Sequence, residues 1–234
     1  MILGCGNVSE VILAPALSSI TDYFHVDQAA SQALLSGFFI PMALFPLVYG
    51  TLSDRFGRRL PLLFSLAILA LGGLLGALSE SFEILVLARV LQGLGNASVI
   101  LIVVTIINDS YERSDAVRVL ATISGIMMIV PTFSFAFGGL ITDLISWKGI
   151  MIVIFLTGII SLVLSLIYLP ETNLRPRQKF NLTNLTRDYR SLLTNRVYLA
   201  YMFVSTFIVG GWLTMLGFVP FEYRRMGVDS TEVG

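Results

Sequence analysis

The chain has 234 residues, of which 56% are hydrophobic and only 13% are charged, whereas charged residues make up about 25% of an ordinary soluble domain. Its 15 basic and 15 acidic side chains cancel, so no overall field favours nucleic acid or an acidic partner. The single cysteine, Cys5, excludes an internal disulfide, and no nucleophile, metal or phosphate motif accompanies the single histidine, His25. The composition is that of a membrane protein and argues against an enzyme.

Seven stretches of the chain are long and apolar enough to cross a bilayer, which takes about 20 largely apolar residues in a helix. Hydrocarbon offers backbone groups no water, so we expect helices rather than open strands. The predicted fold class is therefore all-α, a polytopic membrane protein. The expected spans cover approximately residues 2–21, 29–51, 60–79, 84–107, 117–141, 147–169 and 197–220.

Basic residues gather in alternate loops. Arginine and lysine are concentrated after the second and sixth spans, and Arg113 and Arg118 follow the fourth. The other loops between spans hold acidic residues and a single basic one, Lys148. Because cytoplasmic loops carry the excess of lysine and arginine, we expect the basic loops in the cytoplasm and the protein in the plasma or inner membrane of a cell.

The first six spans form two copies of a three-span unit. A shift of 89 residues lays spans one to three on spans four to six, and it places Gly50 and Asp54 on Gly139 and Asp143. Three is an odd number, so the second copy must be inverted in the membrane. Inverted repeats are typical of secondary transporters, with the binding site near the bilayer midplane. The alternative is that so short a match arises by chance.

The loop between the second and third spans carries a spaced motif, in which a glycine permits close helix approach and a second glycine permits a tight turn. The spacing resembles the loop signature of the major facilitator superfamily, whose loop locks against the second half of the transporter. Asp109, at the cytoplasmic end of span four, is the expected partner of one of its arginines. The alternative, that the arginines only set topology, does not explain the spacing. The motif residues are Gly50, Asp54, Arg55, Gly57, Arg58 and Arg59.

Span four contains a second motif, Arg89-x-x-Gln92-Gly93, which resembles a pattern associated with proton coupling in the same superfamily. A charge inside a span costs about 2.5–3.5 kcal/mol even on insertion scales, so it requires a partner or water. Glu10 is the one acid well inside an expected span, and at ~1.5 Å per residue it lies about 7 Å from Arg89 in depth. We expect a proton or a cationic substrate to compete for this carboxylate. Alternatively, Glu10 is only hydrogen-bonded near a helix end.

Span five contains Gly125, Pro131, Gly138 and Gly139. This set resembles the antiporter signature of the drug-exporting branch, including exporters of the Bcr/CflA type, although Phe135 stands where those usually have a second proline. A proline removes a backbone donor and kinks a helix, and glycines allow close helix contact. The alternative is that such residues are ordinary features of spanning helices.

The family resemblance predicts three regions. Residues 1–170 are expected to form the N-terminal six-helix bundle, which Leu169-Pro-Glu-Thr172 closes as in such exporters. Residues 171–196 are expected to be a cytoplasmic linker with an amphipathic helix, because leucines recur there at helical spacing. Residues 197–234 would be the first helix of an incomplete C-terminal bundle and an outer tail. A full member has twelve spans, so the chain looks truncated and its missing half is an expected partner.

The resemblance implies proton-coupled export of small hydrophobic or cationic compounds by alternating access. The partners would be the substrate and the bilayer, and the proton would be the coupling ion, with no other cofactor, no metal and no nucleic acid. The alternatives are an uptake symporter of the same superfamily or a non-transporting membrane fragment. We expect a substrate cavity lined by spans one, two, four and five, with the residues Glu10, Phe38, Phe39, Gln92, Asn96 and Met127.

Overall fold

The computed structural model describes residues 2–173 and 193–225, and the regular structure in these ranges is helical. The expected all-α fold is confirmed. The elements are α1 (Ile2–Val11), the 3-10 helix η1 (Ala14–Ala16), α2 (Leu17–Phe24), α3 (Gln28–Leu44), α4 (Pro46–Phe56), α5 (Arg59–Ala77), α6 (Phe82–Asn96), α7 (Val99–Ser110), α8 (Arg113–Leu144), α9 (Trp147–Tyr168) and α11 (Arg196–Arg225).

The helices follow the expected spans in chain order. Five described helices are long and apolar enough to cross a membrane, and the pair α3 and α4, bent by 43°, makes a sixth. The first expected span is divided into α1, η1 and α2. Pro15 lies at this division, where it cannot donate a backbone hydrogen bond to continue the helix. Span one is therefore two short helices joined by a break within the bundle.

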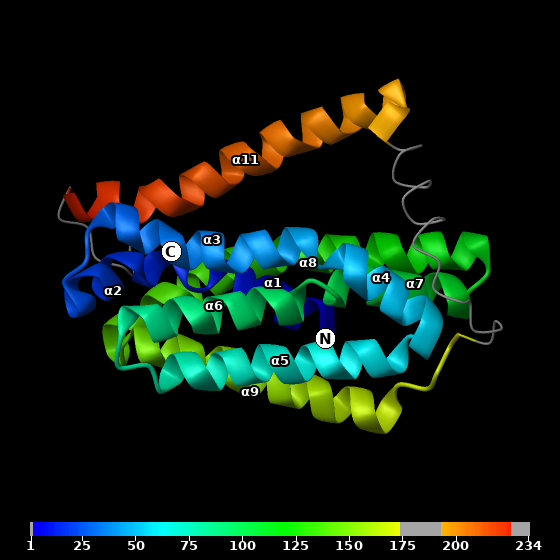
Figure 1. Ribbon diagram of the computed structural model, residues 1–234, viewed down its shortest axis with the longest axis horizontal. Coiled ribbons are helices and arrows are strands. Elements are labelled where there is room, and N and C mark those ends of the chain that lie inside the picture. The colour runs from blue at the N-terminus through cyan, green and yellow to red at the C-terminus, as the bar shows by residue number, and fades with distance from the viewer. Residues whose placement is uncertain (1, 174–192, 226–234) are drawn as a thin grey trace.

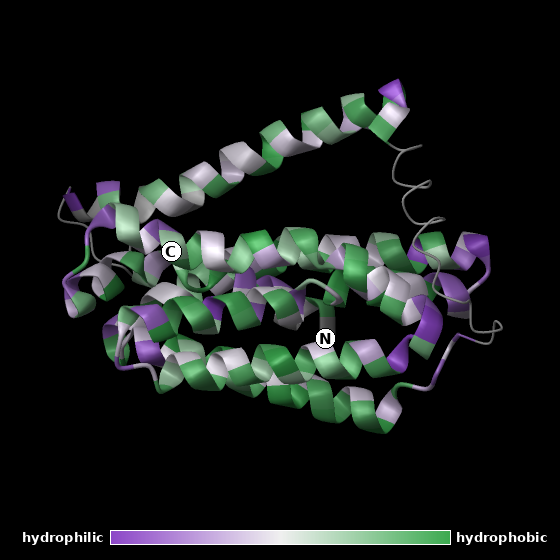
Figure 2. Ribbon diagram, viewed as in Figure 1, coloured by the Kyte–Doolittle hydropathy of each residue, from purple (hydrophilic) through white to green (hydrophobic). Residues whose placement is uncertain are grey.

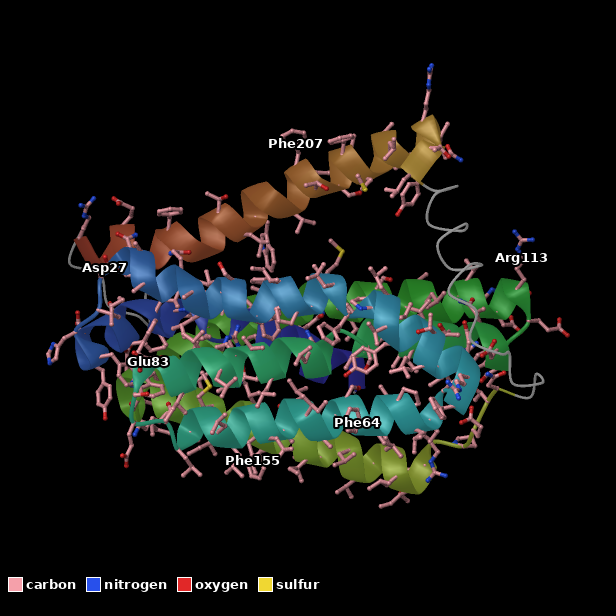
Figure 3. The ribbon with its side chains drawn as sticks, viewed as in Figure 1. Asp27, Phe64, Glu83, Arg113, Phe155 and Phe207 are labelled. Carbon is pink, nitrogen blue, oxygen red and sulfur yellow. The ribbon has the colours of Figure 1, made fainter. Side chains whose placement is uncertain are left out.

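The helices of the bundle run side by side along its long axis, so their ends form two polar surfaces (Figures 1 and 2). Hydrophobic residues occupy the middle of the bundle and hydrophilic ones lie at its two ends. Figure 3 places Asp27 and Glu83 at one end and Arg113 at the other. The acidic and basic loops thus lie at opposite ends, as the positive-inside rule requires of alternate loops.

Glycines bring the central helices into backbone contact. A Cβ at Gly95 of α6 would lie 2.5 Å from the amide nitrogen of Leu69 in α5, and one at Gly73 of α5 would lie 2.5 Å from that of Phe155 in α9. Small residues allow helices in membranes to approach this closely. Helix α5 is therefore packed between α6 and α9.

Helices α8 and α11 are the least covered. Helix α11 crosses the bundle obliquely and approaches it at one end (Figure 1), where the Gln32 side-chain amide donates to the Gly217 carbonyl at 3.1 Å. Phe207, midway along α11, is 78% exposed and points away from the bundle in Figure 3. The amphipathic helix expected in the linker falls mainly on residues 174–192, which lie outside the described residues.

The glycine contact between α5 and α6 makes a testable prediction. Gly95→Ala should destabilise the protein by about 1–3 kcal/mol, because the added methyl group meets the backbone of α5 and forces the helices apart. Gly125→Ala is the matched control, since nothing lies within 4 Å of a Cβ there, and it should be neutral or stabilising by up to about 1 kcal/mol. Thermal unfolding in detergent measures both. Equal unfolding temperatures for the two variants would contradict the packing described for α5 and α6.

Candidate functional site

Arg89 is the centre of a polar site inside the bundle. Its side chain, on α6, is fully buried. Its Nη1 donates to the Gln92 Oε1 at 2.7 Å and to the carbonyl of Ser9 in α1 at 3.2 Å. Its Nε donates to the carbonyl of Leu34 in α3 at 3.3 Å. One guanidinium therefore joins spans one, two and four through uncharged oxygen atoms.

Glu10 lies in the last turn of α1 and is half-buried. Among the described residues, Arg89 is the charged group that acts on it. No ion pair within 4.0 Å joins the two side chains in the part of the chain that the structure describes. The sequence analysis placed the two groups about 7 Å apart in depth. In the structure carbonyl and amide oxygens accept the hydrogen bonds of the guanidinium, and the two charges interact through space.

Of the expected substrate residues, Met127 alone lies on a wall of the two cavities described below. Phe38, Gln92 and Asn96 are buried among packed helices, and Phe39 packs against the hydrophobic core. Their side chains are used within the bundle: Gln92 accepts from Arg89, and Asn96 donates to the carbonyl of Gly6 at 3.3 Å. The structure thus places these four residues in helix contacts rather than on the wall of a described cavity.

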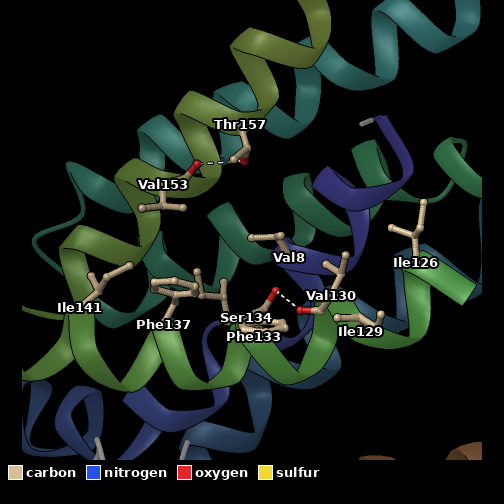
Figure 4. A pocket seen from close by; sticks show the side chains of 11 residues that line it. Val8, Ile126, Ile129, Val130, Phe133, Ser134, Phe137, Ile141, Val153 and Thr157 are labelled. Carbon is tan, nitrogen blue, oxygen red and sulfur yellow. Dashed lines mark hydrogen bonds between the residues drawn. The ribbon is translucent and has the colours of Figure 1, made fainter.

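Two neighbouring cavities lie beside α1, between α8 and α9. One, of about 440 Å³, is lined by Val8 and by apolar residues of α8 and α9 (Figure 4). The other, of about 740 Å³, includes Met127, the one expected cavity residue that lies on a described cavity wall. The hydroxyls of Ser134 and Thr157 donate to carbonyls of their own helices at 2.7 and 2.9 Å. These cavities therefore suit apolar rather than polar molecules.

The glycine and proline set of span five lies on α8, which continues through Pro131. Gly138 is buried, and a Cβ there would collide with the carbonyl oxygen of Ile12. The expected close contact is therefore present at Gly138, where α8 meets the break in span one. Gly139 is also buried, whereas Gly125 has open space around it.

The loop motif forms an ion-pair network at the basic end of the bundle. The Arg58 guanidinium contacts Asp54 at 2.6 Å and Asp109 at 3.0 Å, and it donates to the Ser53 hydroxyl at 2.9 Å. The expected contact between Asp109 and one of the arginines is present. Burial opposes the charge on Arg58, but its bonds to the two carboxylates raise the pKa of Arg58 above its ordinary value. This network ties the end of span two to the end of span four.

Other motif residues lie at the edge of this network. A Cβ at Gly50 would lie 3.8 Å from the side chain of Leu101 in α7, an ordinary contact distance, so the helix approach here does not require a glycine. The Arg55 guanidinium lies 5.1 Å from the centre of the Phe56 ring. Arg59 donates to the carbonyl of Leu166 at 2.7 Å, which joins the loop to the end of α9.

Glu171 completes the network from the end of span six, a role that the sequence analysis did not assign. Its carboxylate accepts from the backbone amides of Arg58, Arg59 and Asn173 at 2.8, 3.2 and 2.9 Å. Gly57 makes room for it, because its φ is +93° and a Cβ there would collide with the carboxylate. Partial burial opposes ionisation, but these amides hold the pKa of Glu171 below its ordinary value. The sequence feature that could have indicated this role is the position of Glu171, an acid directly after Pro170 at the end of a helix.

Comparison with known proteins identifies the family. Residues 2–234 match the model of the Major Facilitator Superfamily. The chain belongs to this superfamily of transporters. It is 32% identical over 205 residues to an uncharacterized transporter of Rickettsia bellii (strain RML369-C), a match that covers 88% of this chain and 50% of the relative.

The major facilitator match extends to a resistance protein and to a solved structure. The chain is 27% identical over 198 residues to a bicyclomycin resistance protein homolog of Haemophilus influenzae (strain ATCC 51907 / DSM 11121 / KW20 / Rd), covering 84% of this chain and 50% of that protein. Its fold is similar to that of a bacterial homolog of the human lysosomal transporter Spinster, with a TM-score of 0.73 and 18% identity, covering 99% of this chain and 54% of the other. The chain spans about half the length of these proteins.

The Arg58 network predicts a difference between two arginines of this major facilitator bundle. Arg58→Ala should destabilise the protein by about 1–3 kcal/mol, because it leaves two carboxylates and a buried hydroxyl without their donor. Arg118→Ala is the matched control, since its pair with Asp115 is 3.9 Å long and both side chains are largely exposed; its effect should stay within about 0.5 kcal/mol. Thermal unfolding at neutral pH compares them, and similar losses for both would contradict the assignment.

Glu171 predicts a dependence of stability on pH. A carboxyl whose pKa is depressed in the folded state contributes stability above its ordinary pKa of 4.5 and loses it as the pH falls through the folded value. Wild type should therefore be more stable than Glu171→Gln at neutral pH, and the difference should shrink below pH 4.5. Thermal unfolding of both proteins between about pH 3 and pH 7 measures this. A difference that does not change with pH would show that the amide bonds to Glu171 carry no charge dependence.

Proposed function

We propose that this chain forms the first half of a proton-coupled exporter of small hydrophobic or cationic compounds that works by alternating access. The observation that carries the proposal is the fully buried guanidinium of Arg89 beside Glu10, a half-buried acid without an ion-pair partner within 4.0 Å among the described residues. Ionisable groups at membrane depth usually mark proton or substrate pathways. A relative whose name records bicyclomycin resistance supports export as the direction.

The chemistry of exchange depends on the carboxylate of Glu10. Arg89 supplies a fixed positive charge near it. Binding a proton and a cationic compound to the carboxylate at the same time would therefore cost additional electrostatic energy. Loading a proton would then release the cation, and loading the cation would release the proton. This competition is the physical basis of antiport, because each cargo is bound in a different state of the same group.

The cavities support a hydrophobic substrate class. Their walls come mainly from α1, α8 and α9 and consist mainly of aliphatic and aromatic side chains. Val8 on α1 and Ile12, directly after it, face the cavity of about 440 Å³, whereas Glu10 is about 200° around the helix from Val8. In this proposal the apolar part of the substrate binds against this side of span one, and the exchangeable charge of Glu10 lies on the other side.

The Arg58 network supports a role as the cytoplasmic part of the gate. It joins the ends of spans two, four and six through Asp109 and Glu171, so these ends would move as one body. In this proposal the loop and the linker 171–196 face the cytoplasm of a cell whose plasma or inner membrane holds the protein. The loop residues would then lock against the second half of the transporter in one conformation.

Export is tested in cells that lack their own drug exporters. Cells expressing a complete transporter that contains this chain should accumulate less of a fluorescent cationic dye than cells with an empty vector, and collapse of the proton gradient should abolish the difference. Glu10→Gln and Arg89→Ala should each return accumulation to the empty-vector level, because one removes the exchangeable charge and the other removes its neighbour. Arg118→Ala, on the exposed surface, should behave as wild type. Equal accumulation in wild type, Glu10→Gln and Arg89→Ala cells would sink the coupling role.

A further inference from the structure

We infer that Phe38 is a positioning residue for Arg89, and that the face of its ring holds the guanidinium in place of a counter-ion. Phe38 lies on α3 and is fully buried. The Cζ of Arg89 lies 4.2 Å from the centre of the Phe38 ring. A guanidinium over an aromatic face is attracted by the negative charge density of the ring, and the attraction is strongest where water is excluded.

The helix packing brings the ring under the cation. Gly93 lies one turn after Arg89 on α6, and a Cβ there would collide with the carbonyl oxygen of Phe38. A glycine at this position therefore lets α6 lie directly against α3. The ring of Phe39 meets that of Phe38 edge to face, with centroids 5.3 Å apart and an interplanar angle of 88°. The backbone of Phe38 thus lies against α6 and its ring contacts Phe39, while the ring face meets the guanidinium.

The remaining contacts of Arg89 show what the ring supplies. Its hydrogen bonds go to the carbonyl oxygens of Ser9 and Leu34 and to the side chain of Gln92, all of which are uncharged. Its Nη2 is buried and has no hydrogen-bond partner within the described ranges. The ring face is a further attractive surface for this cation, besides the more distant charge of Glu10. Arg89 is therefore held by dipoles and a π face, without a carboxylate within 4.0 Å among the described residues.

This arrangement has a consequence for Glu10, and that consequence rests on the proposed function. A guanidinium bonded directly to Glu10 would occupy the carboxylate that must take up and release cargo. Because Phe38 and the neutral oxygens hold Arg89, Glu10 senses its charge without being bonded to it. In this inference Phe38 acts through Arg89, a role different from the cavity lining that the sequence analysis expected of it.

The position of the ring is tested first without any transport. The protein is purified into lipid nanodiscs with isotope-labelled arginine, and the Arg89 signal is assigned by its loss in Arg89→Lys. The side-chain protons of Arg89 should be shifted to lower frequency by the ring current. The shift should disappear in Phe38→Leu and persist in Phe39→Leu, whose ring is a neighbour of similar size. An unshifted signal in wild type, or a shift that survives Phe38→Leu, overturns the inference.

The function of the ring is tested by fluorination, which weakens the charge density of its face while nearly preserving its shape. Mono-, di- and trifluorophenylalanine at position 38 of the complete transporter should lower proton-driven dye efflux in that order, to a total loss of about tenfold. The same series at position 39 should leave the rate of efflux unchanged. Equal efflux across the series at position 38 overturns the positioning role. This test does not depend on Phe38→Leu, so it holds even if that variant fails to fold. A ring-current shift in a protein with no efflux supports the inference and contradicts only the proposed function.

Discussion

A fully buried guanidinium constrains the rest of the bundle. Arg89 is fully buried at membrane depth, where an uncompensated charge is expensive. Its partners come from α1, α3 and α6, so these three helices must keep their relative rotation and height for the charge to be tolerated. The break in span one belongs to the same arrangement, because the carbonyl of Ser9 that accepts from Arg89 lies in the last turn of α1. The polar site and the packing of the bundle therefore depend on one another.

Arg58 and Arg89 are both buried cations, and different groups stabilise their charges. At the basic end, Arg58 pairs with Asp54 and Asp109, and the net charge of the group is offset by carboxylates close to water. Inside the bundle, Arg89 is held by neutral oxygens and the ring of Phe38. In the proposed mechanism the first site keeps the helix ends together, and the second leaves Glu10 able to exchange its cargo.

The sequence predicted the all-α fold, the order of the spans and the two polar ends because each rests on local quantities. A run of about 20 apolar residues needs a helix in hydrocarbon wherever it occurs, and charge in loops can be counted directly. The contact between Arg58 and Asp109 could also be predicted from the sequence, because both residues lie where a span ends on the same side of the membrane. The role of Glu171 was missed because it depends on backbone amides, which no residue pattern reports, and on the open space at Gly57.

By itself the amino-acid sequence determined that the chain crosses a membrane as helices, which end is basic, and which charged residues lie within the spans. Only the tertiary structure decided what those charges touch. Helix rotation and approach are set by contacts between residues far apart in the chain, such as Gly93 against Phe38 and Gly138 against Ile12. These contacts brought the ring of Phe38 under Arg89, and in the described part of the chain no ion pair within 4.0 Å joins Glu10 to Arg89. Hydropathy is a property of one segment, whereas the partner of a buried charge is a property of several helices packed together.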